Sequence, residues 1–312
     1  MGNGLLNLEQ QHDHHHDNND DNNNFFEALP EGFVANALAL FTPKDVCRLS
    51  LVSSVFRSAA QWDVLWEKFL PEDYHKIVSD SAVRFGSKKE LYLWLCDHPV
   101  IIDGGNKSFS LDKLSGKKCY MLAARDLSIV WGDTPRYWRW ISIPESRFAE
   151  VAELKSVCWL EVHGTINTSM LSIDTRYAAY FVYKSTPNTY GFEHYPAEVY
   201  IGLGGVESQT EGQTKTVYLD PAVRLRQRDD HEQQPGRRMG MFGRFRRVRN
   251  QSDPPLNGPK LRQDGWLEIE LGEFFNRKGE VGELEMTMME VKGGNWKGGL
   301  IVQGIEIRPK AS

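Results

Sequence analysis

The stretch LPEGFVANALALFTPKDVCRLSLVSSVFRSAAQWDVLWEKFL, residues 29–70, predicts a short bundle of helices near the start of the chain. Thr42 can cap a helix whose first residue is Pro43, with Asp45 as the acidic residue of a capping box. Apolar side chains then recur at helical spacing and form one stripe: Val46, Leu49, Val52 and Phe56. About forty residues bury so many large side chains poorly on their own. We therefore expect this bundle either to pack on the domain that follows or to bind a partner protein.

The composition of the whole chain limits the classes of protein to consider. The 312 residues allow two domains, and a net charge of −5 with 25% charged residues argues against a nucleic-acid binder or a disordered acidic chain. No apolar run is long enough to span a membrane, and the polar N-terminus lacks the apolar core of a signal peptide. The cysteines are widely spaced, which predicts buried, reduced thiols and neither a disulfide nor a metal site: Cys47, Cys96, Cys119 and Cys158.

Residues 1–24 have low complexity and are rich in Asn, Asp, Gln and His. The histidines could hold a metal ion loosely: His12, His14, His15 and His16. A solvated, disordered tail is the more frequent meaning of such a tract, and we predict a tail here.

Beyond the helical bundle the periodicity changes from helical to alternating. Residues 71–115 are predicted to connect the two parts, with a capping box at 87–90 opening one more helix. Short runs rich in aromatic and β-branched residues follow, separated by turn signals. In WLEIEL, residues 266–271, Leu267, Ile269 and Leu271 point to one side of a strand. Eight or so such strands predict an all-β sandwich over residues 116–309.

One segment interrupts the sandwich pattern. Residues 221–260 carry ten basic against four acidic residues and have frequent Gly and Pro without apolar periodicity. This predicts a long mobile loop. The loop is either a solvated insertion or a segment for nuclear import or anion contact.

Tryptophans gather around the loop after residue 131: Trp131, Trp138 and Trp140, together with Tyr137. They either fill the sandwich core or form a shallow sugar site, because an indole stacks on the apolar face of a pyranose ring. Glu283 and Glu290 could act as the paired carboxylates of a glycosidase. Seven residues along a regular strand put them on opposite faces, which weighs against that chemistry.

The order of residues in 25–70 resembles an F-box, the motif by which ubiquitin-ligase subunits dock a Skp-type adaptor. The resemblance rests on the spacing of Leu-Pro, Pro-Lys-Asp-Val, Leu-Ser-Leu-Val-Ser, Phe-Arg and the Trp-containing end, with Phe56 at a position where many F-boxes carry Trp. It implies a set of docking residues: Leu29, Pro30, Pro43, Leu49, Val52 and Phe56.

A second resemblance covers roughly residues 90–309. The segments 123–140, 150–164, 264–286 and 295–309 are similar to the phloem-protein-2 family, which includes the tobacco-type lectin that binds N-acetylglucosamine oligomers and N-glycan cores. Together with the F-box, the chain resembles the B group of plant phloem-protein-2-like F-box proteins. The family's sugar-binding residues would fall on Trp131, Trp138, Glu283 and Glu290.

These resemblances imply an α+β chain in sequence order, with a small N-terminal F-box followed by a jelly-roll-like lectin sandwich. The expected function is substrate recognition in an SCF-type E3 ubiquitin ligase, with a cullin–RING ligase reached through the adaptor and glycoproteins bound by the sandwich. We expect no catalysis, cofactor, metal, membrane or direct nucleic-acid contact, and location in nucleus and cytoplasm. Two alternatives remain: an adaptor whose sandwich binds non-glycosylated proteins, and a glycosidase.

Overall fold

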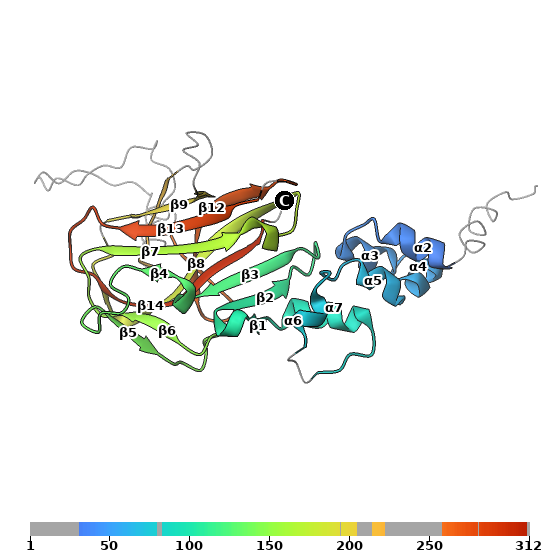
Figure 1. Cartoon of the computed structure of the whole chain (residues 1–312), viewed down its shortest axis with the longest axis horizontal. Helices are drawn as coiled ribbons and strands as arrows, with labels where there is room; N and C mark the ends of the chain where they lie inside the picture. Colours follow the sequence, from blue (N-terminus) through green and yellow to red (C-terminus); the bar gives the residue numbers. More distant parts are fainter. Residues whose placement is uncertain are drawn as a thin grey trace, which may run out of the picture.

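The computed structural model describes residues 31–79, 83–193, 195–204, 214–221, 258–279 and 281–310. A helical module occupies one end of the molecule and a β-rich domain the other (Figure 1). The predicted tail, Leu29, Pro30 and nearly all of the segment 221–260 lie outside the described residues. The helices are α2 (Glu31–Leu38), α3 (Pro43–Leu49), α4 (Ser54–Ala59), α5 (Asp63–Glu67), α6 (Tyr74–Ile77) and α7 (Lys88–Asp97).

The N-caps of both predicted capping boxes are present. The Thr42 hydroxyl accepts a hydrogen bond from the Asp45 backbone N–H at 3.2 Å and donates one to the Asp45 carboxylate at 2.6 Å, which fixes the start of α3. Ser87 caps α7 by accepting from the Glu90 N–H at 3.1 Å. These side chains satisfy backbone donors that the first turn of a helix leaves without a partner.

The helical module packs on the β-rich domain through α7 and a β-turn. Trp66 of α5 is buried, donates its indole N–H to the Ala60 carbonyl at 2.8 Å, and lies 5.2 Å between ring centroids from Tyr92 of α7. Pro43 contacts the turn that carries Gly116, where an added Cβ would lie 3.2 Å from the proline ring. One continuous apolar cluster therefore runs from the helices into the sandwich.

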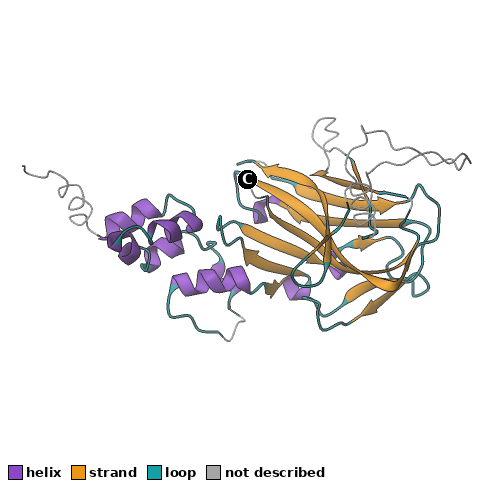
Figure 2. Ribbon diagram, turned by 180° about the vertical axis from the view of Figure 1, so that it is seen from behind, coloured by secondary structure: helices purple, strands orange, loops and turns teal. Residues whose placement is uncertain are grey.

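The strands form two antiparallel sheets (Figure 2). Sheet A has the order β1-β2-β3-β14-β8-β12-β11, with β6 paired to β14 and β5 to β6, and sheet B has the order β10-β9-β13-β7-β4. The strands of sheet A are β1 (Val100–Ile102), β2 (Lys107–Leu111), β3 (Lys118–Ala123), β5 (Trp138–Ile141), β6 (Val151–Leu154), β8 (Thr175–Tyr190), β11 (Lys260–Leu261), β12 (Leu267–Asn276) and β14 (Gly298–Pro309). Those of sheet B are β4 (Ser128–Ile129), β7 (Leu160–Asn167), β9 (Ala197–Leu203), β10 (Lys215–Val217) and β13 (Glu283–Glu290). Short 3-10 turns lie at η1 (Asp103–Gly105), η2 (Ala124–Asp126) and η3 (Thr168–Met170).

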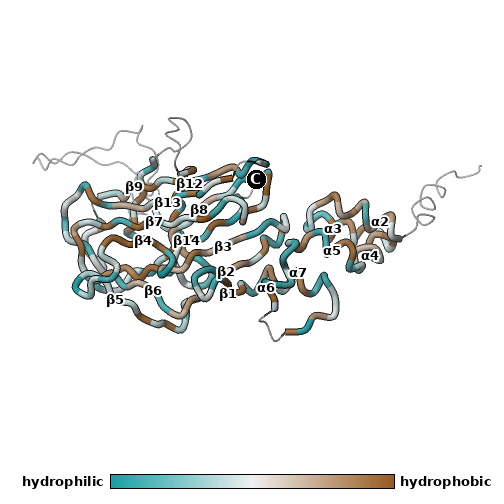
Figure 3. Tube along the Cα trace, in the orientation of Figure 1, coloured by the Kyte–Doolittle hydropathy of each residue, from teal (hydrophilic) through white to brown (hydrophobic). Residues whose placement is uncertain are grey.

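The predicted order of a helical module followed by a β-rich domain of antiparallel sheets is confirmed. Along β12, Ile269 and Leu271 point into the core as the alternation predicts, and the change between hydrophobic and hydrophilic residues along the strands can be followed in Figure 3. Sheet A already begins at Val100, within the segment 71–115 predicted as a connector. The short run of β1 gave too little alternation to identify a strand.

The outer face of β12 and β14 is also covered, which the alternation alone did not predict. Trp266 is fully buried and donates its indole N–H to the Glu145 carbonyl at 3.1 Å. Beside it, two carboxylates are held by three arginines. Arg262 bonds Glu306 at 2.6 Å and Arg308 bonds Glu268 at 2.8 Å. Buried charges need such pairing, because desolvation of an isolated ion is costly.

Among the described residues the four cysteines are free thiols. Cys47 is exposed and the other three are half-buried, so the prediction of buried thiols was wrong for Cys47 and only partly correct for the rest. Cys47 lies on the outer side of the short helix α3, where the helical module does not cover it. No helix in the described part of the chain is long and apolar enough to cross a membrane.

Glu306→Gln should destabilise the chain and remove part of its acid sensitivity. Burial alone would raise the pKa of Glu306, but the hydrogen bond and charge of Arg262, with Arg147 and Arg308, outweigh burial and lower the pKa from 4.5 to about 2. A lowered carboxyl pKa stabilises the fold above pH 4.5, and this contribution is lost as the pH falls toward 2. The loss at neutral pH should be about 3 kcal/mol, measured by urea unfolding from pH 7 to pH 2.5.

Glu283→Gln, at an exposed carboxylate, serves as the matched control and should leave the unfolding free energy within about 0.5 kcal/mol of wild type. Equal pH profiles for wild type and Glu306→Gln would contradict the role given to the arginines.

Candidate functional site

Exposed aromatic side chains gather at the end of the sandwich that lies away from the helical module (Figure 1). We call this the distal end. Within the described residues it is formed by the connections β4–β5, β6–β7, β8–β9 and β13–β14. Each connection carries one or more exposed rings, among them Trp131, Trp159, Tyr195 and Trp296. Exposed aromatic rings concentrated on loops over a rigid sandwich indicate a binding surface.

Trp131 is held in an unusual backbone conformation. Its φ of +60° lies in the left-handed region, which a bulky residue rarely adopts. The turn is fixed by hydrogen bonds from the Gly132 N–H to the Ile129 carbonyl and from the Thr134 N–H to the Trp131 carbonyl, both at 2.9 Å. The exposed indole lies 5.2 Å between ring centroids from Tyr137. Backbone strain of this kind costs about 1–3 kcal/mol and is concentrated at functional sites.

Trp138 differs from Trp131 in its exposure to solvent. It is buried, and its indole N–H donates to the Val130 carbonyl at 3.2 Å. Trp140 similarly donates to the Gly132 carbonyl at 3.2 Å. The indole rings of Trp138 and Trp140 thus bond carbonyl groups of the Trp131 loop from its inner side. Trp138 could stack directly on a ligand only if this loop opened.

Glu290 is buried at the distal end, where β13 enters the turn to β14. Its carboxylate forms an ion pair with Lys297, whose side chain is fully buried, and accepts a hydrogen bond from the Gly293 N–H at 3.0 Å. The Lys297 ammonium group also donates to the Cys158 carbonyl at 2.9 Å. The pair therefore ties the β13–β14 turn to the β6–β7 loop.

Glu283 does not join the other predicted residues. It lies at the opposite end of β13 and is exposed, whereas Glu290 is buried. Seven residues of strand separate them by about 23 Å. Paired glycosidase carboxylates lie roughly 5–10 Å apart, so Glu283 and Glu290 cannot flank one glycosidic bond. The structure thus brings Trp131 and Glu290 to the distal end, with Trp138 beneath, and leaves Glu283 apart.

A hydrogen-bonded chain of side chains lies on the outer face of sheet B and was not predicted from the sequence. Glu161 accepts from the Trp159 indole N–H at 2.6 Å and from His163 Nε2 at 2.8 Å, and His163 Nδ1 lies 2.9 Å from the Thr287 hydroxyl. The hydrogen bond from Trp159, followed by that from His163, lowers the pKa of Glu161. The signal was present in the alternation of SVCWLEV, where Trp159 and Glu161 share one face.

At the other end of the molecule, the helical module exposes apolar side chains. Leu51 and Val52, in the α3–α4 turn, are 79% and 78% exposed. Of the other predicted docking residues, Pro43 is buried against the turn at Gly116, and Leu49 and Phe56 are half-buried. Three further apolar residues are exposed but were not among the predicted docking residues: Phe33, Leu40 and Phe41.

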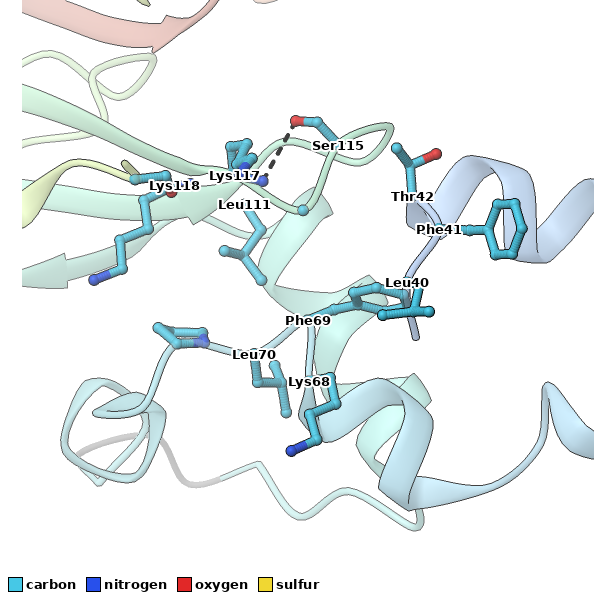
Figure 4. Close-up of a pocket in the computed structure, with 13 residues that line it drawn as sticks. Leu40, Phe41, Thr42, Lys68, Phe69, Leu70, Leu111, Ser115, Lys117 and Lys118 are labelled. Carbon is cyan, nitrogen blue, oxygen red and sulfur yellow. Dashed lines mark hydrogen bonds between the residues drawn. The ribbon is translucent and has the colours of Figure 1, made fainter. Parts of the chain in front are cut away.

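A pocket of about 410 Å³ lies between the helical module and the sandwich (Figure 4). Leu40, Phe69 and Leu70 line it from the helical side, and Leu111 and Lys118 from the sandwich. It belongs to the junction between the two parts and lies at the end of the sandwich opposite the aromatic loops.

Comparisons with protein families agree with this division. The F-box domain model matches residues 26–68, and the Phloem protein 2 model matches residues 117–309. The chain is an F-box protein of the phloem protein 2 family. The resemblance seen in the sequence is thereby confirmed.

Relatives of this F-box protein extend over most of its length. F-box protein PP2-B10 of Arabidopsis thaliana is 44% identical over 287 residues, covering 91% of this chain and 94% of the relative. F-box protein VBF of the same plant is 42% identical over 290 residues, covering 90% and 99%. Among solved structures, TmCBM61 in complex with β-1,4-galactotriose has a TM-score of 0.26 and 8% identity over 59% of this chain and 87% of that chain. That likeness is too distant to bear on fold or ligand.

Lys297→Met should destabilise this F-box protein by about 3–5 kcal/mol, because it leaves the Glu290 carboxylate buried without its cation. The double variant Lys297→Met/Glu290→Gln removes both charges while Gln still accepts from the Gly293 N–H, so it should recover at least half of the loss. Urea unfolding of the four proteins in this cycle measures the coupling. A cost below 1 kcal/mol for Lys297→Met alone would contradict the structural role of the pair.

Proposed function

We propose that the chain is the substrate-recognition subunit of an SCF-type E3 ubiquitin ligase, and that its sandwich binds N-acetylglucosamine-containing glycans on target proteins. The observation that carries this proposal is the placement of two exposed apolar surfaces at opposite ends of one molecule: aliphatic and aromatic side chains on the F-box, and aromatic rings on the loops of the distal end.

The F-box surface suits a Skp-type adaptor. Leu51, Val52, Phe33 and Leu40 expose apolar area that the helical module does not bury itself. Burial of such area against a partner supplies the main driving force for association. Through the adaptor the chain would join a cullin–RING ligase.

The distal end suits a glycan. Trp131 presents an exposed indole beside Tyr137, on a loop that Trp138 and Trp140 fix from beneath. A fixed ring loses little conformational freedom when it stacks on a sugar, which favours binding. Glu290 would act on this site through Lys297 and the loops they hold, since its carboxylate is buried.

In this proposal the chain performs no catalysis and requires no cofactor. It would raise the local concentration of a bound glycoprotein near the ubiquitin-loaded enzyme, which increases the rate without a chemical step of its own. We also propose location in nucleus and cytoplasm, with the arginine-rich segment within 221–260 as the import signal.

Leu51→Asp/Val52→Asp should weaken binding of the Skp-type adaptor by more than tenfold, because it puts two charges on the exposed apolar turn. The measurement is affinity by biolayer interferometry, with the full chain and purified adaptor. Leu261→Asp, on an exposed leucine of the sandwich with 75% exposure, is the matched control and should bind as wild type does. Equal affinity of wild type and the double variant would exclude this turn as the docking surface.

Trp131→Gly should abolish binding to N-acetylglucosamine oligomers without harming the fold. Glycine adopts a φ of +60° freely, so the variant removes the indole while it relieves backbone strain. Trp131→Phe should retain part of the affinity, since a smaller ring can still stack. A glycan array with the full-length chain measures all three proteins. Undiminished binding by a well-folded Trp131→Gly would show that this loop is not the sugar site.

A further inference from the structure

The outer face of sheet B carries a second group of side chains suited to a ligand. Met289 of β13 pairs with Glu198 of β9 on one side and with Glu161 of β7 on the other. The two carboxylates therefore flank one half-buried methionine, with about 10 Å between their backbones. One row nearer the distal end, Pro196 and Val291 line a pocket next to Met289. The floor of this surface is apolar and its sides are polar.

Trp159 lies next to the apolar floor of this surface, and its indole is held in a fixed orientation. Glu290 pairs with Leu160, so the next residues, Val291 and Trp159, adjoin across β13 and β7. The indole is 45% exposed, yet its N–H is bound by Glu161, which is bound in turn by His163 and Thr287. Glu161, His163 and Thr287 thus hold the Trp159 indole in place, although this exposed ring contributes little to the hydrophobic core. Such preorganisation is what a stacking surface for a ligand requires.

The adjacent pocket has a volume of about 180 Å³, which suits one sugar ring better than an extended segment of polypeptide. Tyr195, Thr216 and Lys292 line it together with Glu198. Tyr195 is exposed and supplies an aromatic ring to the lining of this pocket.

Three charged side chains of this surface already have partners. Lys292 forms an ion pair with Glu198, and Glu161 is occupied by the Trp159 indole and His163. An anionic ligand would gain little there, because the ammonium group of Lys292 is already paired with Glu198. The carboxylate oxygens retain lone pairs for hydroxyl donors, and the Thr216 hydroxyl and Lys292 can donate. A neutral ligand with many hydroxyl groups and one apolar face fits this combination.

We propose that the outer face of sheet B is a second carbohydrate subsite, in which Trp159 stacks on one ring of a neutral oligosaccharide and Glu161 and Glu198 accept hydrogen bonds from its hydroxyl groups. This inference rests on the proposed glycan-binding function and adds a ligand contact that lies outside the Trp131 loop. His163 and Thr287 are positioning residues, since they act through Glu161.

The test measures binding of the N-acetylglucosamine trimer and pentamer to the full-length chain by isothermal titration calorimetry. Trp159→Ala should weaken binding of the pentamer by about tenfold, because it removes the stacking platform. Trp159→Phe keeps a ring and should lose no more than about threefold. Glu161→Gln, which retains an acceptor oxygen, should fall between the two. Thermal unfolding of each variant verifies the fold, and Trp131→Gly is measured beside them.

The outcomes separate this subsite from the function on which it rests. If Trp131→Gly abolishes binding while Trp159→Ala matches wild type within twofold, the second subsite is overturned and the glycan-binding function stands. If the folded wild type binds neither oligomer, both are overturned.

Discussion

The ion pair between Lys297 and Glu290 is the interaction on which the distal end depends. Both side chains are buried where β13 turns into β14, and Lys297 also bonds the Cys158 carbonyl of the neighbouring loop. A buried pair gains little stability over apolar residues of the same size, but loss of one partner is strongly destabilising. The pair thus fixes the geometry of the loops that carry Trp159 and Trp296, and it explains how a buried glutamate can affect a surface it does not reach.

The F-box and the aromatic loops lie at opposite ends of the molecule. The F-box lies against the turn at Gly116, and the aromatic loops lie at the far end of strands up to sixteen residues long. An adaptor bound at one end would leave the other end free for a target. Because α7 and one continuous apolar cluster join the two parts, a target bound at the distal end would be held in a defined position relative to the F-box.

Much of the fold could be predicted from local patterns. Thr42 and Ser87 marked helix starts because a cap needs only neighbours in sequence, and the alternation of β12 assigned its inner face. The candidate site was harder to predict from the sequence, because it depends on which loops come together in the folded chain. Lys297 gave no sign of burial, because its partner is reached only when β13 and β14 fold back. Trp159 lies in a run of residues that predicts only a strand. The sequence around Pro43 likewise does not indicate its contact with the turn at Gly116.

A bridging experiment tests most directly the claim that the two ends act together. The Skp-type adaptor is fixed on beads, the full-length chain is added, and retention of a glycoprotein bearing N-acetylglucosamine is measured with and without free N-acetylglucosamine oligomer as competitor. The account predicts that the beads retain the glycoprotein only when the chain is present, and that the oligomer releases the glycoprotein while the chain stays bound. Mutually exclusive binding of adaptor and glycoprotein, or retention unaffected by the oligomer, would contradict the account.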